Sequence, residues 1–204
     1  MSTSEVSRHE RLPPGHERDD TPPAPGDLEQ VRSFLSLHDH TATSPDSLPA
    51  SPGSIGWWLR TQGLVPEGAE LDRTDLRWAG DVLEAMRAKV LENMGAPRDD
   101  DALATLNAAG EAVGLTPCFG CTHGDAFHTS ATGVRGAIAR LLGVMFLAER
   151  DGSWARFKEC SSPTCRAVFW DRSKNHSGRW CSMSQCGNRA KVRAYRERER
   201  TPAR

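Results

Sequence analysis

The sequence has little that would carry the protein into or across a membrane. Its longest apolar run, Ile138–Ala148, is interrupted by Arg140 and is much shorter than the roughly 20 residues that a transmembrane helix requires. The N-terminus lacks the apolar core of a secretory signal peptide. We therefore expect a cytoplasmic protein with no membrane partner, in a compartment where thiols stay reduced.

The sequence also lacks the motifs that mark common catalytic sites. It contains no nucleophile elbow, no P-loop, no glycine-rich dinucleotide fingerprint and no paired-histidine motif of zinc proteases. His38 and His40 flank Asp39, but two side chains separated by one residue on a helix point away from each other. No residue pattern supports catalysis, so we expect a protein that is not an enzyme.

Net charge is almost absent, but this average hides a division of the chain. The whole sequence has a net charge of −1, whereas residues 1–153 carry 13 Lys and Arg against 23 Asp and Glu. Residues 154–204 carry 13 basic against 4 acidic side chains. Such an asymmetry favours a nucleic acid or another acidic partner at the basic end.

The apolar pattern predicts a fold that is mainly α with a small β component. Residues 1–26 are rich in proline and charge and are predicted to be disordered. Residues 27–152 form the predicted helical domain, which we expect to be regulatory, and they precede a module at 153–200 and a tail at 201–204. The expected helices are Leu28–His38, Ser54–Gln62, Thr74–Met94, Asp100–Ala109 and Thr132–Glu149. A loop at Thr41–Gly53 and a stretch of mixed turn and strand at Val113–Ser130 complete the domain.

Four cysteines in the C-terminal module have the spacing of a structural zinc site. Cys160 and Cys165 enclose four residues, as do Cys181 and Cys186, and fifteen residues separate the two pairs. Two short cysteine pairs can each present two thiolates from one turn, at the distance that tetrahedral zinc requires. Four protein thiolates leave no coordination position for water. We therefore predict one structural zinc ion per chain rather than a catalytic one.

The residues around the fourth cysteine resemble a known family. Cys186-Gly187-Asn188-Arg189 is similar to the tetrapeptide that names the CGNR zinc finger, and the preceding cysteine pairs fit that pattern. Upstream, Trp58-Leu59, Gly63-Leu64 and Leu103–Asn107 resemble the helical domain of a stress-induced transcriptional regulator. Family members commonly have an aromatic-Val-Asn-Thr run where this chain has Leu35–Asp39. The resemblance implies DNA binding and gene regulation.

The finger continues into a segment of high helix propensity that ends before Pro202. Arginines at helical spacing form one stripe on this predicted helix, and two further basic residues form a flanking row. The candidate nucleic-acid contacts are Asn188, Arg189, Lys191, Arg193, Arg196, Arg198 and Arg200. Asn188 has two alternative roles, as a base reader or as a turn cap. The alternative for the whole segment is a solvated, salt-bridged helix, but its direct attachment to a zinc ligand favours nucleic acid, and DNA over RNA.

A second group of potential ligands lies upstream. Cys118 and Cys121 form a Cys-x-x-Cys pair that is followed by His123 and His128. These four residues could hold a second metal ion, form a redox pair or lie in a turn of the helical domain with partly buried thiols.

Together these features indicate a zinc-dependent DNA-binding transcriptional regulator. The helical domain would bind a small-molecule effector or mediate assembly, and specific recognition by a single basic helix would require a homodimer. Two alternatives remain open. In one, the finger is a protein-interaction module. In the other, the helical domain binds a small molecule in a pocket among Trp57, Trp58, Trp78 and His38, and the finger is purely structural.

Overall fold

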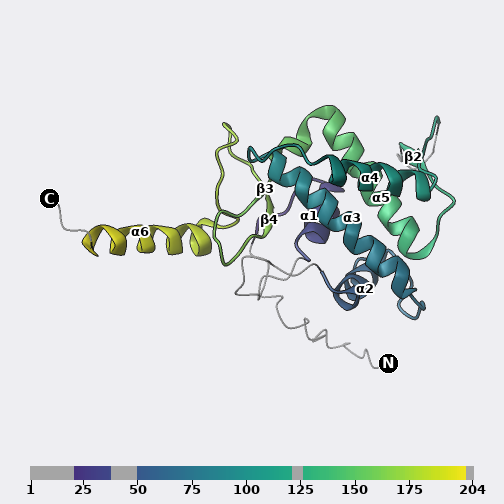
Figure 1. The fold of residues 1–204 in the computed structure, drawn as a ribbon, viewed down its shortest axis with the longest axis horizontal. Helices are drawn as coiled ribbons and strands as arrows, with labels where there is room; N and C mark the ends of the chain where they lie inside the picture. Colours follow the sequence, from purple (N-terminus) through teal and green to yellow (C-terminus); the bar gives the residue numbers. More distant parts are fainter. Residues whose placement is uncertain (1–20, 38–49, 121–125, 201–204) are drawn as a thin grey trace, which may run out of the picture.

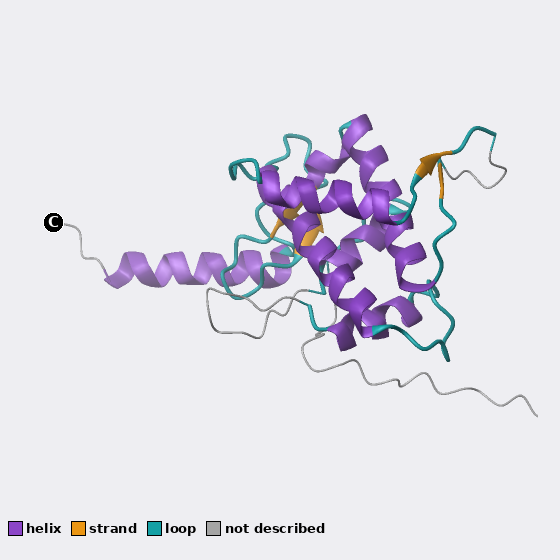
Figure 2. Ribbon diagram, turned by 45° about the vertical axis from the view of Figure 1, so that its right-hand side comes forward, coloured by secondary structure: helices purple, strands orange, loops and turns teal. Residues whose placement is uncertain are grey.

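The computed structural model describes residues 21–37, 50–120 and 126–200. Its larger elements are the helices α1 (Leu28–Leu35), α2 (Pro52–Thr61), α3 (Arg73–Glu92), α4 (Asp100–Ala112), α5 (Gly133–Asp151) and α6 (Asn188–Arg200). The strands are β1 (Thr116–Pro117), β2 (Phe127–His128), β3 (Phe157–Glu159) and β4 (Val168–Trp170), and two short helical turns are η1 (Ser153–Arg156) and η2 (Met183–Gly187). The prediction of a mainly α fold with a small β component is confirmed (Figures 1 and 2).

The core is built by the apolar faces of α1, α2, α3 and α5. On α3 the predicted stripe is buried, with Leu83 and Met86 completely inaccessible to solvent. On α5 the side chains of Ile138 and Leu141 are likewise buried completely. Residues three and four apart on a helix share one face, and both helices therefore turn a continuous apolar surface to the same core.

Several helix boundaries differ from the prediction by one to three residues, as for α1, which ends at Leu35 and not at His38. Two of the differences have a clear cause. α2 begins at Pro52, inside the predicted loop, because the side chain of Ser51 accepts a hydrogen bond from the backbone N–H of Ser54. Serine at the N-cap followed by proline at the first helical position is a common helix start. α4 runs three residues beyond Ala109, and the chain turns out of it at Gly114, which has a φ of +59°. Such a left-handed φ costs glycine little.

The end of the predicted disordered segment also needs correction. Thr21 and Ala24 are buried, and the backbone N–H of Ala24 donates to Glu29 at 2.7 Å. The guanidinium of Arg172 also donates to the carbonyl oxygen of Pro23 at 2.5 Å. Residues 21–26 thus hold a defined position between α1 and the C-terminal module, because apolar burial and these hydrogen bonds offset the entropy of ordering them.

The β3–β4 hairpin of the C-terminal module belongs to the same hydrophobic core as the helices. Phe157 and Val168 are completely buried in the cluster that contains the apolar residues of α1, α3 and α5. The side-chain amide of Asn93, at the end of α3, donates to the carbonyl oxygens of Trp154 and Phe157 at 2.8 and 3.0 Å. The hairpin is therefore positioned by the helices as well as by its own module.

α6 has the opposite environment. It projects from the rest of the described chain (Figures 1 and 2), contacts mainly the η2 turn that precedes it, and buries none of its side chains. None of the described helices combines the length and the apolar character needed to cross a membrane.

Candidate metal centre

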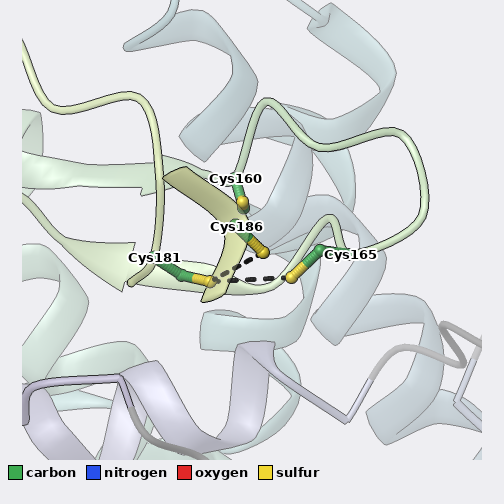
Figure 3. Close-up of side chains that lie close together, drawn as sticks. All are labelled: Cys160, Cys165, Cys181 and Cys186. Carbon is green, nitrogen blue, oxygen red and sulfur yellow. Dashed lines mark hydrogen bonds between the residues drawn. The ribbon is translucent and has the colours of Figure 1, made fainter. Parts of the chain in front are cut away.

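The four predicted zinc ligands converge on one point. The sulfur atoms of Cys160, Cys165, Cys181 and Cys186 all lie within 4.8 Å of one another, and Figure 3 shows them turned toward a common centre. The Sγ atoms of Cys165 and Cys181 are 3.6 Å apart, and those of Cys181 and Cys186 are 3.8 Å apart. A tetrahedral zinc ion with Zn–S bonds of about 2.3 Å separates its sulfurs by about 3.8 Å. The four cysteines therefore fit one structural zinc ion, as predicted.

The first cysteine pair is presented by the end of the β3–β4 hairpin. Cys160 follows β3 directly, and its backbone N–H donates to the carbonyl oxygen of Ala167 at 2.9 Å. The N–H groups of Cys165 and Arg166 both donate to the carbonyl oxygen of Ser162. Arg166 adopts a left-handed φ of +50°, which closes this turn and brings the two sulfurs together.

The second pair comes from η2, a single turn of π-helix that leads into α6. Cys186 is buried inside this turn, and the N–H of Gly187 donates to the carbonyl oxygen of Ser182 at 3.0 Å. A hydrogen bond of 2.8 Å from the N–H of Ser161 to the carbonyl oxygen of Arg179 joins the first pair to the segment before Cys181. The sequence analysis did not predict the π-turn, because helix propensity predicts only a continuous helix that begins at Gly187.

The four thiols influence one another's protonation because they are so close. Hydrogen bonds from the thiols of Cys165 and Cys181 lower the pKa of Cys160 to about 2. The same contacts, seen from the other side, raise the pKa of Cys165 to about 12 and also raise that of Cys181. The thiolate of Cys160 is thus stabilised, whereas Cys165 and Cys181 are held in the thiol form. A bound cation removes this conflict, because it stabilises all four thiolates together.

Residues 156–199 match the family described as the CGNR zinc finger. This segment is a CGNR zinc finger. The match includes all four cysteines and nearly all of α6, and it begins after α5 has ended. No curated protein matches the chain.

A buried aspartate organises the loop between the two cysteine pairs of the CGNR zinc finger. Asp171 accepts hydrogen bonds from the N–H groups of Ser173 and Gly178, and its Oδ2 lies 2.8 Å from the Nζ of Lys158. Burial would raise the pKa of the Asp171 carboxyl, but the hydrogen bonds from Lys158, Ser173 and Gly178 outweigh it and hold that pKa below its ordinary value of 3.8. The carboxylate therefore stays charged and fixes the loop that leads to Cys181.

A buried ion pair joins the CGNR zinc finger to α3. The Nη2 of Arg87 lies 2.5 Å from Glu159, the residue before Cys160, and it also donates to the carbonyl oxygen of Arg166 at 3.2 Å. The Nε of Arg166 in turn donates to Glu159 at 2.9 Å. Both residues that adjoin the first cysteine pair are thus bonded to a side chain of the helical part. The sequence analysis missed this contact, because 72 residues separate Arg87 from Glu159 and no local pattern relates them.

All seven predicted nucleic-acid contacts lie on α6 and are exposed. The arginines at 189, 193, 196 and 200 line a shallow depression of about 660 Å³ along one side of the helix. The side-chain amide of Asn188 donates to the carbonyl oxygen of Ser184 at 3.2 Å, which is the contact of a turn cap. Its role as a base reader stays a prediction.

The second predicted group of ligands is only partly within the described residues. Cys121 and His123 lie outside them, and His128 is exposed in β2. Cys118 is disulfide-bonded, so its sulfur is not available to a metal ion in this state. Within the described residues, the four cysteines of the finger are the only group of this kind found close enough to share a metal. Because two of the four residues lie outside the described part of the chain, the second metal stays a prediction.

Proposed function

We propose that this protein is a cytoplasmic transcriptional regulator that binds duplex DNA by placing α6 in the major groove. The observation that carries the proposal is a zinc-anchored helix that buries no side chain and presents a continuous stripe of arginines. An α-helix with its side chains is about 10–12 Å wide and fits the major groove, which is about 12 Å wide. Arginine suits this surface because its planar guanidinium can bind phosphate or guanine through two hydrogen bonds.

The arginine stripe itself supports a polyanionic partner. Arg189, Arg193 and Arg196 succeed one another at intervals of four and three residues, and Arg200 follows after four more. Like charges at these intervals destabilise an isolated helix by a few tenths of a kcal/mol per pair. Phosphates along a groove would convert this repulsion into attraction. We therefore expect α6 to gain helicity when it binds DNA.

The zinc site would hold the start of this helix. Isolated helices of about 13 residues are marginal in water, and α6 receives no help from burial. Cys186 lies two residues before the start of α6, so zinc coordination would fix the direction in which the helix leaves the finger. A zinc ion with four thiolates also carries net negative charge, which is favourable at the positive end of a helix dipole.

In this proposal the helical part has a sensing or assembly role and the protein is not an enzyme. Four protein thiolates would leave the zinc ion no open position for a substrate. Of the suggested tryptophan pocket, His38 lies outside the described residues. Trp58 is buried in the core, where its Nε1 donates to Ser33 at 3.1 Å. Trp78 instead lies on the outside of α3 beneath the guanidinium of Arg135. A small-molecule effector and a homodimer remain predictions.

The deciding experiment is a titration of the zinc-loaded protein with duplex DNA over a range of salt concentrations, with bound zinc counted in the same sample. We expect one zinc per chain and an affinity that falls steeply as salt rises, because each phosphate contact contributes about 0.9 to the logarithmic slope. One zinc per chain without DNA binding would refute the proposal and leave a protein-docking or purely structural finger.

Paired substitutions would locate the interface. Replacing Arg193 and Arg196 with alanine should reduce the salt slope by about two units if each contacts a phosphate. Arg77→Ala with Arg150→Ala is the matched control, because it removes the same charge from exposed positions on α3 and α5. An equal loss of slope in both double variants would assign the effect to net charge and not to α6.

A further inference from the structure

A groove on the outside of the helical part has the character of a helix-binding surface. It has a volume of about 820 Å³ and runs between α3 and α4. Its floor is made of alanines, of which Ala85, Ala102 and Ala109 are buried. Small residues allow two helix backbones to approach closely, so a groove of this kind accepts the small face of another helix.

The rim of the groove is acidic. Asp81 lines it from α3, Asp99 and Asp101 line it from the start of α4, and all three are exposed. The one basic side chain of the lining is Arg135, which is bound to Asp75 at 2.8 Å and lies over the ring of Trp78. The groove therefore offers an alanine floor between negative charges, and it would attract a helix whose small face has a net positive charge.

α6 has such a face. Ala190 and Ala194 lie four residues apart and share one side of the helix. Arg193 and Glu197, four residues apart, flank this alanine row on one side, and Lys191 and Arg198 flank it on the other, at 100° of rotation per residue. Three basic side chains against one acidic side chain give this face a net positive charge. No side chain of α6 is buried, and the helix contacts mainly η2, so this face is accessible to a partner.

The two surfaces also agree in length. α6 spans 13 residues, which is about 20 Å at 1.5 Å per residue. The lining of the groove on α3 extends from Trp78 to Ala88, which is about 15 Å at the same rise. A helix of the length of α6 would therefore fill the groove from one end to the other.

We infer that the groove between α3 and α4 binds α6 of a second copy of this chain. The helix of the same copy does not reach it, because α6 is attached to the finger and points away from α3 and α4 (Figure 1). Every copy has one helix and one groove, so mutual exchange closes a two-fold dimer in which no binding surface is left open. Arg193 belongs to the arginine stripe and also flanks the docked alanine row.

Self-association would therefore compete with DNA for α6. This competition rests on the proposed function, whereas the dimer itself does not.

The test measures self-association of the full-length, zinc-loaded protein without DNA, by sedimentation velocity at rising protein concentration. We expect dimers at low salt that dissociate as NaCl rises to about 0.5 M, because opposite charges hold the contact and the Debye length falls to a few ångströms. A wild-type protein that stays monomeric at low salt at about 0.1 mM overturns the inference, even if it binds DNA.

Charge exchange identifies the two surfaces. Asp81→Lys with Asp101→Lys should weaken the dimer at least about tenfold, as should Arg193→Glu with Arg198→Glu, because each change places like charges in contact. Mixing the groove variant with the helix variant should restore both docked contacts, one between the unchanged surfaces and one between the surfaces of exchanged charge. Glu67→Lys with Glu70→Lys, which changes two exposed acids outside the groove by the same charge, should leave the dimer intact. Equal weakening by this control, or a mixture that stays monomeric while zinc content and circular dichroism are normal, overturns the inference.

Discussion

α5 and α6 are both long helices on either side of the β3–β4 hairpin, but they are held by different forces. α5 has nine buried residues among 19 and ends at Asp151, and the left-handed φ of +79° at Gly152 turns the chain into the finger. α6 has no buried side chain and is attached only through the π-turn that contains Cys186. The first is a component of the core, and the second depends on a metal-binding turn at one end.

This difference shows where stability and function are separated in the chain. The buried face of α5 is fixed by the core, so the helix cannot turn that face to a new partner. α6 leaves its whole circumference accessible and has to obtain its order from the zinc site and from whatever it binds. The β3–β4 hairpin between the two helices belongs both to the apolar core and to the zinc site, because its strands are buried in the core and its end carries two zinc ligands.

The strongest way to break the comparison is to remove one zinc ligand. Cys165→Ser should release the metal and melt α6, because binding free energy on the order of 10 kcal/mol holds such sites together. α5 should stay folded, because its contacts are apolar. Zinc content and residue-resolved hydrogen exchange would measure this. Thr164→Ala, an exposed neighbour of the same turn, should keep both zinc and α6. Retention of one zinc per chain by Cys165→Ser would contradict the four-ligand site.

A cavity in the core should have the opposite effect. Ile138→Ala removes a completely buried side chain of α5 and should lower the free energy of unfolding by about 2–5 kcal/mol. Val192→Ala on α6, where the side chain is 49% exposed, should change it by less than about 0.5 kcal/mol. Denaturant titrations of both variants would test the contrast. Similar losses in the two variants would mean that α6 is packed more tightly than the structure indicates.

Acid should act on the metal-held part first. Because the pKa values of Cys165 and Cys181 are raised by their neighbours, both thiols carry protons at neutral pH that zinc has to displace. Zinc affinity should therefore fall at least about 100-fold for each unit that the pH is lowered, because zinc binding releases at least these two protons. Competition with a chelator at several pH values would measure this slope. A pH-independent affinity would show that the apo-site already holds its thiolates.

A smaller effect is expected in the loop that leads to Cys181. In Gly178→Ala the new Cβ would lie 2.6 Å from the Oδ1 of Asp171, which is held in place by its hydrogen bonds. This overlap should destabilise the loop by about 1–3 kcal/mol and weaken zinc binding accordingly. Gly53→Ala is the control, because its Cβ would find only an ordinary contact of 3.7 Å with Ser51. Unfolding and zinc-affinity measurements on both variants decide the point, and equal effects would argue against the Asp171 contact.

Much of the fold could be predicted from local pattern. The buried stripes of α3 and α5 follow from apolar residues at helical spacing, and the zinc ligands follow from the spacing of two cysteine pairs. The start of α2 was missed although Ser51-Pro52 is a recognisable helix start. These features depend on residues within a few positions of one another, which is the range that sequence periodicity covers.

The contacts that join the finger to the helices could not be predicted in this way. The Arg87–Glu159 pair and the hydrogen bonds of Asn93 connect residues more than 60 positions apart. Phe157 and Val168 of the finger are buried against the helical part, which the division of the chain into a helical domain and a separate module did not predict. The sequence shows which residues are charged or apolar. It does not show which distant residue each of them contacts, because that depends on the three-dimensional path of the chain.

The π-turn of η2 has a geometric consequence for the direction of the arginine stripe. Since α6 touches little besides this turn, the angular phase of the stripe around the helix axis is set by the residues between Cys186 and Arg189. Inserting one residue there would rotate every side chain of α6 by about 100° while leaving the composition of the helix unchanged. The short CGNR segment thus determines which way the arginine stripe faces relative to the zinc site.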